Sequence, residues 1–176
     1  SPVLGIDIVD LSDPKLQERN KRSLKLILCE KDQLIDHENV FWLLWAAKEA
    51  VFKCHREAFN FSPTSIPIQF YSEFDELRFS SDSFQGILII NSEYILAVCA
   101  NDLDLIDHQT VTLENGANGD NMRSEIIEFF KEKELNFEMG SDELNLPILL
   151  PSNEPISISH HGKFGAFAYP KSLLNV

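Results

Sequence analysis

The sequence predicts an α+β fold made of two pseudo-symmetric lobes, each a helix packed on a small antiparallel sheet. Each half of the chain runs through a helix-like segment into strand-like segments, and the halves end in similar apolar stretches, EYILAVCA and KFGAFAY. The chain has 176 residues, of which 44% are hydrophobic, so it can bury a substantial core. We assign residues 1–104 to the first lobe and residues 105–176 to the second.

The first lobe begins with a strand, a basic segment and a helix. Residues 3–9 (VLGIDIV) predict a buried strand, although this strand contains Asp7. Residues 11–29 form a basic amphipathic stretch, and a helix is predicted from residues 38–39 to about Phe59. Four alternating segments then predict an antiparallel meander at residues 66–71, 77–80, 84–90 and 94–100.

The second lobe begins after an acidic and polar region. Residues 101–121 are acidic and polar and contain a close pair of glycines, so we place the boundary between the lobes there. A helix is predicted near residues 121–135, followed by a loop rich in Pro and Asn. The chain then forms two strands, PISIS and FGAFAY, separated by the break HHGK.

The charge balance and hydropathy exclude several classes of protein. There are 28 Asp and Glu residues against 15 Lys and Arg residues, a net charge of −13, which disfavours a coat on nucleic acid or an anionic membrane. The longest apolar run, Val40 to Ala47, is too short to span a bilayer, and the first residues show no basic leader. We therefore expect a cytoplasmic protein. The three cysteines are widely spaced, as is typical of reduced core residues.

Residues 40–54 (VFWLLWAAKEAVFKC) predict a helix that is buried nearly all round. Its charged residues are Lys48, Glu49 and Lys53, which fall within about 140° of one another on a helical wheel. Buried charges need partners, and a metal together with a polyphosphate would supply them. An exposed strip with a Glu49–Lys53 pair is the alternative, and these residues alone do not decide between the two.

Asp7 raises the same question, because a carboxylate between Ile6 and Ile8 in a strand is costly without a partner. It could cap a turn, or it could bind a cation. Asp7 and Glu49 are the hard oxygen ligands that Mg²⁺ prefers, and Mg²⁺ usually takes only one or two carboxylates from a protein. Lys48, Lys53 and the basic stretch could then hold phosphate.

Residues 155–169 (PISISHHGKFGAFAY) bring a hydroxyl, an imidazole and an ammonium together near Gly162. Ser159, His160 and Lys163 make a reasonable set of phosphate contacts, although side chains at a strand end are often structural or solvated. No Gly-x-Ser-x-Gly elbow is present, and adjacent histidines point apart in an extended chain, which argues against a serine hydrolase and against a zinc pair.

Three motifs together resemble the signatures of the 4′-phosphopantetheinyl transferase superfamily: GIDIVDL at 5–11, WAAKEAVFK at 45–53 and SISHHGKFGAFAY at 157–169. The resemblance implies Mg²⁺-dependent transfer of the phosphopantetheine arm of coenzyme A to a serine of an apo acyl or peptidyl carrier protein, as in holo-[acyl-carrier-protein] synthases. The other product would be adenosine 3′,5′-bisphosphate, and the pathway would be fatty acid or polyketide biosynthesis.

By similarity, Asp7 and Glu49 would be magnesium ligands. The phosphates of coenzyme A would be bound by Lys48, Lys53, Ser159, His160 and Lys163. Glu49, or a water held by the metal, is the candidate general base, and Lys53 would stabilise charge on the reacting phosphate. We expect the basic segment, with Arg19 and Arg22, to attract the carrier protein or the 3′-phosphate of the coenzyme.

The chain departs from the superfamily pattern in two ways. Larger pseudodimeric members have a second acid two places after the first, where this chain has Val9, whereas Asp10 is similar to the small trimeric type. The Ser-His segment comes last, as in the small type, yet the chain is too long for that type. We therefore expect a pseudodimeric member in permuted order, acting as a monomer, with a trimer as the alternative.

Two other classes of function fit some of the same residues. A magnesium-dependent phosphodiesterase or nuclease could use Asp7, Glu49 and Lys53, although the acidic balance of the chain disfavours it. A catalytically silent module that binds coenzyme A or a carrier protein would also keep these motifs.

Overall fold

The computed structural model describes residues 1–16, 19, 21–57 and 60–175 of the chain. The elements of the first part are, in order, β1 (Leu4–Asp10), α1 (Lys21–Lys25), α2 (Val40–His55), the short 3₁₀ helix η1 (Pro63–Ser65), β2 (Gln69–Glu73), β3 (Glu76–Ser81), β4 (Phe84–Ile90) and β5 (Tyr94–Ala100). Those of the second part are η2 (Leu103–Leu105), β6 (Ile106–Thr112), α3 (Gly119–Lys131), β7 (Glu138–Ser141), β8 (Pro147–Leu150), β9 (Glu154–Pro155), β10 (Ser157–His161), β11 (Phe164–Pro170) and η3 (Lys171–Leu174). The result is an α+β fold, as predicted.

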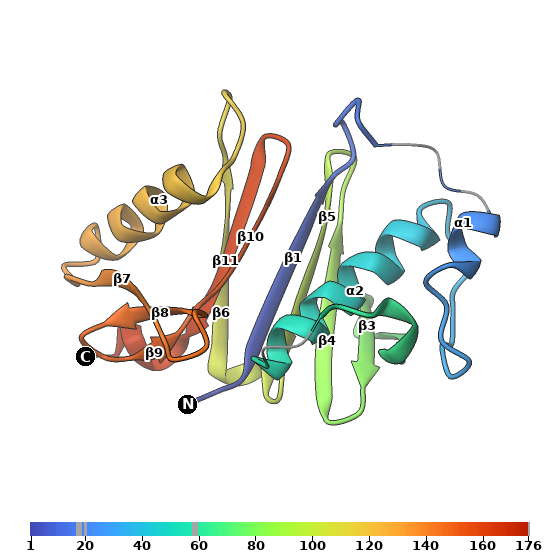
Figure 1. Ribbon diagram of the computed structural model, residues 1–176, viewed down its shortest axis with the longest axis horizontal. Coiled ribbons are helices and arrows are strands. Elements are labelled where there is room, and N and C mark those ends of the chain that lie inside the picture. Colours follow the sequence, from blue (N-terminus) through green and yellow to red (C-terminus); the bar gives the residue numbers. More distant parts are fainter. Residues whose placement is uncertain (17–18, 20, 58–59, 176) are drawn as a thin grey trace.

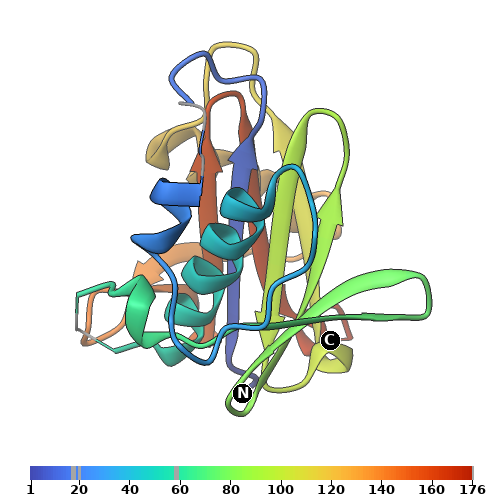
Figure 2. The ribbon, with the colours of Figure 1, turned by 90° about the vertical axis from the view of Figure 1, so that its right-hand side faces the viewer.

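The strands form antiparallel sheets, and the two larger sheets face each other. The five-stranded sheet has the order β1-β5-β4-β3-β2, and the three-stranded sheet opposite has the order β10-β11-β6 (Figure 1). A small third sheet, β7-β8-β9, lies beside the second. Figure 2 shows α2 lying across the face of the five-stranded sheet, in front of β1.

Three buried clusters hold these layers together. One lies between α2 and the five-stranded sheet and includes Leu43, Ala47 and Phe79. A second lies between the two larger sheets, and a third packs α3 against β11. Because β1 contributes to the first two clusters, its residues are buried on both faces.

The structure corrects the predicted limits of several elements. α2 ends at His55, because Arg56 adopts a left-handed conformation with φ of 46° and its N–H caps the helix. The predicted end at Phe59 lies outside the described residues. Helix α3 begins at Gly119, two residues earlier than predicted, because Asn118 caps it through the backbone N–H groups of Asp120 and Asn121.

Strands β6 to β9 were missing from the prediction. β6 occupies part of the polar region that we assigned to a boundary, and it is an edge strand whose residues are mostly half-buried. Such a strand shows no clear alternation, and β7, β8 and β9 are each four residues or fewer. Only pairing with their neighbours identifies them.

The buried helix expected from residues 40–54 is present as α2. Residues that face the sheet include Ala46, Ala47 and Ala50, whose small side chains let the helix lie close to β1. None of the helices in the described part of the chain combines the length and the apolar character that crossing a bilayer requires.

Gly5 of β1 lies where the backbones of β1 and α2 approach most closely. A Cβ atom at this position would be 2.0 Å from the carbonyl oxygen of Ala50, a backbone atom that cannot move away without shifting the helix. The glycine of the GIDIV motif therefore sets the distance between α2 and β1.

The substitution Gly5→Ala is expected to destabilise the protein by about 3 kcal/mol, at the upper end of overpacking effects, because the clash is with backbone. Denaturant unfolding measures this loss. Gly119→Ala is the matched control, since a Cβ there meets nothing within 4 Å, and it should leave the midpoint nearly unchanged. Equal midpoints for both variants would contradict the proposed close contact.

Candidate active site

Asp7 lies in the middle of β1 with its side chain on the α2 side of the strand. Leu4, Ile6 and Ile8 belong to the core between the sheets, so the alternate positions Gly5 and Asp7 face the helix. The Asp7 side chain is 12% exposed. A carboxylate is therefore held in a nearly dry position, where it needs partners.

The first partner comes from α2. Lys53 Nζ donates to Asp7 Oδ1 at 3.1 Å and to the carbonyl oxygen of Ile6 at 2.8 Å. Glu49 lies one helical turn before Lys53, and its carboxyl group interacts electrostatically with both Asp7 and Lys53. Burial raises the pKa of Glu49, the Asp7 carboxylate raises it further, and Lys53 partly offsets both effects. The structure thus brings Asp7, Glu49 and Lys53 together.

The second partner comes from β10. This strand lies near the end of the sequence but runs beside β1 in the structure (Figure 1). Ser159 Oγ donates to Asp7 Oδ1 at 2.9 Å and accepts from the Ile8 N–H at 3.2 Å. Ser157 Oγ accepts from the Ile6 N–H at 3.1 Å in the same way. These side chains occupy the edge of β1 that no backbone strand pairs with, so they join the two larger sheets.

His161 makes the third link of this series. Its Nδ1 accepts from the Asp10 N–H at 2.9 Å, and its Nε2 lies 3.1 Å from Asp13 Oδ2. Ser157, Ser159 and His161 each bind the residue 151 positions earlier, so β1 and β10 run parallel and in register.

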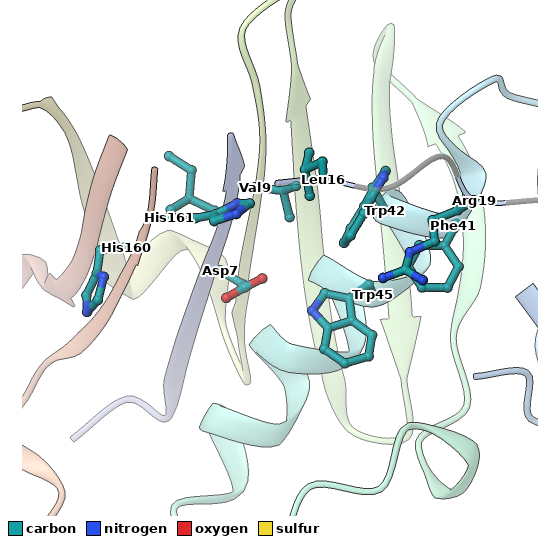
Figure 3. Close-up of a pocket in the computed structure, with 10 residues that line it drawn as sticks. Asp7, Val9, Leu16, Arg19, Phe41, Trp42, Trp45, His160 and His161 are labelled. Atoms are coloured by element: carbon teal, nitrogen blue, oxygen red, sulfur yellow. The ribbon is translucent and has the colours of Figure 1, made fainter. Parts of the chain in front are cut away.

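A cavity of about 290 Å³ opens beside Asp7, between β1, β10 and the first turns of α2 (Figure 3). One wall holds Asp7 and the two histidines of β10, and the opposite wall is aromatic and apolar. Arg19 lies over that wall, with its Cζ 5.0 Å from the ring centroid of Phe41 and 5.4 Å from that of Trp42. The residues of the apolar wall are Leu16, Phe41, Trp42 and Trp45, and Ile8 and Val9 of β1 also line the cavity.

A second cavity of about 200 Å³ lies at the other end of the cluster, between the end of α2 and β8 and β10. Lys53 and Ser157 border it, together with Arg56, which is paired with Asp142 at 2.8 Å. The group formed by Asp7, Glu49 and Lys53 therefore has a hollow on each side, one bordered by Asp7 and the other by Lys53.

Comparison with known proteins identifies the family. The model of the 4′-phosphopantetheinyl transferase superfamily matches residues 3–99, more than half of the chain. The chain belongs to this superfamily. The match confirms the resemblance and contains both Asp7 and the residues of α2. A search of curated proteins and a search of solved structures found no match.

The SISHH segment lies outside the matched range. The structure connects it to the matched part through the bonds from Ser157, Ser159 and His161 to β1. His160 lies between them in sequence and is exposed, and Figure 3 shows its ring turned in a different direction from that of His161.

The chemistry of Asp7 and Glu49 suits a divalent cation. Asp7 raises the pKa of Glu49 because the two negative charges repel each other. A bound cation would relieve this repulsion, and two carboxylates suffice for Mg²⁺ when water and phosphate oxygens complete its shell. Among residues 1–16, 19, 21–57 and 60–175, no three His, Cys, Asp or Glu side chains gather as a metal site. Asp10 does not supply a third carboxylate.

The carboxylate of Asp10 instead accepts hydrogen bonds from the protein itself. It accepts from Ser12 at Oδ1 and from the Lys163 N–H at Oδ2. Burial raises its pKa, but these hydrogen bonds outweigh that effect and the pKa of Asp10 is lowered overall.

The structure places Lys48 away from this site, which corrects its predicted contact with coenzyme phosphates. Its side chain is fully buried, and Nζ donates to Asp32 Oδ2 and to the carbonyl oxygens of Pro63 and Ile66, all within 2.8 Å. Three acceptors satisfy the three N–H bonds of an ammonium group. Lys48 therefore ties the segments around Asp32 and Ile66 to α2, and we leave it out of the proposed site.

The other predicted phosphate contacts lie on separate segments of the chain. Arg19 lies on the rim of the cavity, and Arg22 lies on α1. Lys163 is at the turn between β10 and β11, with Nζ 3.5 Å from Glu93 Oε1 and 5.1 Å from the ring centroid of Phe164.

Sequence reasoning missed His161 and the aromatic wall as parts of this region. The strand period of two that places Ser157 and Ser159 on one face also places His161 there. Trp42 and Trp45 are three residues apart on a helix and so share a face, but their apolar character indicated only a core position.

Glu49→Gln is expected to raise the thermal unfolding midpoint at pH 7 in metal-free buffer. A carboxyl whose pKa is raised on folding holds its proton to higher pH in the folded state, so stability falls as pH rises above the ordinary glutamate value. Glutamine removes this cost, and the gain should vanish in acid. Glu128→Gln, an exposed change on α3, is the control. A lower midpoint for Glu49→Gln at pH 7 would contradict the argument.

Proposed function

We propose that this protein transfers the 4′-phosphopantetheine arm of coenzyme A to a serine of an apo carrier protein and releases adenosine 3′,5′-bisphosphate. One observation carries the proposal: Asp7, Glu49 and Lys53 lie together at a point bordered by two cavities. The first two come from the GIDIV and KEA motifs, within the range that the superfamily model matches.

The two cavities suit an extended ligand with anionic groups in its middle. Coenzyme A has a diphosphate between a nucleotide and a long, uncharged arm, so its ends must extend in opposite directions from the site that binds the diphosphate. Lys53 is 27% exposed and borders the second cavity, which supports its role as a contact for these phosphates.

Charge is the main obstacle to the reaction, because a serine oxygen must attack a phosphorus atom that already carries negative charge. Lys53 would stabilise charge on the transferring phosphate, and Ser159 and Lys53 would hold Asp7 in place. Mg²⁺, bound by Asp7 and Glu49, would neutralise the diphosphate when present.

The proposed transfer forms one bond and breaks one. The carrier serine oxygen bonds to the β-phosphorus, and the bond from that phosphorus to the bridging oxygen breaks, so that oxygen leaves with adenosine 3′,5′-bisphosphate. The serine proton passes to Glu49, or to a water next to it. Glu49 is proposed as the acceptor because its carboxyl group lies in the same cluster as Asp7 and Lys53.

The proposal is tested by incubating apo carrier proteins with coenzyme A, Mg²⁺ and the enzyme, followed by intact-mass measurement. The native protein should add one phosphopantetheine group per carrier, and Asp7→Asn and Glu49→Gln should each lose at least about a hundredfold in rate, as expected for loss of a group that binds the reacting phosphates. Glu128→Gln is the control for a carboxylate lost from the surface.

Each failure of this experiment has a separate meaning. Coenzyme A cleaved without modification of any carrier would indicate a phosphodiesterase. Binding of coenzyme A without cleavage or transfer would indicate a silent binding module. Full activity in both variants would remove Asp7 and Glu49 from the mechanism.

Arg19 and Arg22 are proposed to attract the carrier protein. The net charge of −13 repels acidic partners at long range, so a local cationic surface beside the cavity is needed for an acidic carrier. Arg19 lies on the cavity rim, over Phe41 and Trp42, and α1 begins two residues later.

Reversal of both charges, Arg19→Glu with Arg22→Glu, is expected to raise the KM for the carrier about fivefold at low salt and less at high salt. Steady-state kinetics with carrier and coenzyme varied separately would distinguish docking from coenzyme binding. Lys131→Glu with Lys171→Glu makes the same change in net charge on exposed residues elsewhere. Unchanged carrier kinetics would refute the docking role.

We also propose that the two halves are related lobes in permuted order. In each half the first strand pairs antiparallel with the last, β1 with β5 and β6 with β11, and a helix follows the first strand. Because β1 and β10 come from the same chain, a monomer would contain the complete site.

A further inference from the structure

The segment after β1 leads directly to the apolar wall of the cavity, and the side chains of Asp10 and Asp13 both hold its backbone. Asp13 Oδ1 accepts from the Lys15 N–H at 2.8 Å, and its carbonyl oxygen accepts from the Leu16 N–H at 3.0 Å. Leu16 borders the cavity and packs against the core beneath α2. Asp13 therefore helps to fix the position of Leu16.

His161 contacts this segment from the opposite sheet. Its Nδ1 accepts from the Asp10 N–H, so a neutral ring carries its proton on Nε2, which lies 3.1 Å from Asp13 Oδ2. The Asp13 side chain is only 12% exposed, which strengthens the contact relative to one on the open surface. Figure 3 shows the His161 ring turned toward the cavity beside Val9.

The backbone of His161 is also held in place, by Asp10 and the turn between β10 and β11. Asp10 Oδ2 accepts from the Lys163 N–H at 3.1 Å, and a Cβ on Gly162, which has φ of +57°, would lie 2.2 Å from the same oxygen. Glycine is required at this position for both conformation and space. The turn thus holds the His161 backbone against Asp10, and the imidazole reaches Asp13 from a rigid support.

We propose that His161 and Asp13 form a positioning pair that holds the wall formed by Leu16, and the Arg19 that follows it, against the cavity beside Asp7. Neither residue is assigned to the chemistry: His161 acts through Asp13, and Asp13 acts through the backbone that it folds. The effect on catalysis rests on the proposed function, whereas the structural effect does not.

The two tryptophans allow a direct test without any ligand. The chain contains only Trp42 and Trp45, and both line the cavity. In a Trp45→Phe background, fluorescence reports Trp42, which lies beneath Arg19. His161→Ala and Asp13→Ala are each expected to raise the acrylamide quenching constant about twofold, because release of a surface segment exposes what it covers.

Conservative variants separate positioning from the strand-to-strand bond. Asparagine in His161→Asn can still accept from the Asp10 N–H but is too short to reach Asp13, so quenching should match that of His161→Ala. His108→Ala, a half-buried histidine on β6, is the control and should leave quenching at the native value. Circular dichroism establishes that each variant is folded.

In the transfer assay the same variants should raise the KM for coenzyme A about tenfold with kcat changed much less, because a cavity wall contributes to binding rather than to the reacting atoms. Native quenching in both His161→Ala and Asp13→Ala would overturn the proposal, as would full recovery in His161→Asn. If the native protein modifies no carrier, the proposed function fails, and the quenching results still decide the role of the pair.

Discussion

The Asp7 carboxylate is buried in a strand that is covered on both faces, and every other part of the candidate site is arranged around its need for partners. Lys53 from α2 and Ser159 from β10 both donate to Oδ1 of Asp7. These donors come from positions 46 and 152 residues away along the chain. A single costly group therefore connects the helix, the central strand and the second sheet, because a charge in a dry setting must be compensated.

The joint between the two sheets has an unusual form, since side chains rather than backbone groups satisfy the free edge of β1. Ser157, Ser159 and His161 take the place of a neighbouring strand. This leaves the sheets separate while β1 and β10 remain in register. Cavities are present on both sides of this joint, one bordered by Asp7 and the other by Lys53.

The two lysines of α2 illustrate how burial decides the role of a charge. Lys48 has three oxygen acceptors around its ammonium group and is fully buried, and burial lowers its pKa although Asp32 opposes that shift. Lys53 is partly exposed and borders a cavity. Only the second can meet a ligand without breaking the protein's own contacts, although both residues carry the same charge on the same helix.

Periodicity and motifs were sufficient to predict the α+β class, the central strand, the buried helix, strands β4 and β5, and the family. Asp7, Glu49 and Lys53 were selected because charges in apolar segments need partners, and that rule is visible in the sequence. The roles of Lys48 and His161 and the existence of strands β6 to β9 were decided only by tertiary structure. The contacts that decide these features come from distant segments: the acceptors around Lys48, the Asp13 carboxylate facing His161, and the partners of those strands. A local sequence pattern does not show which distant groups will be in contact.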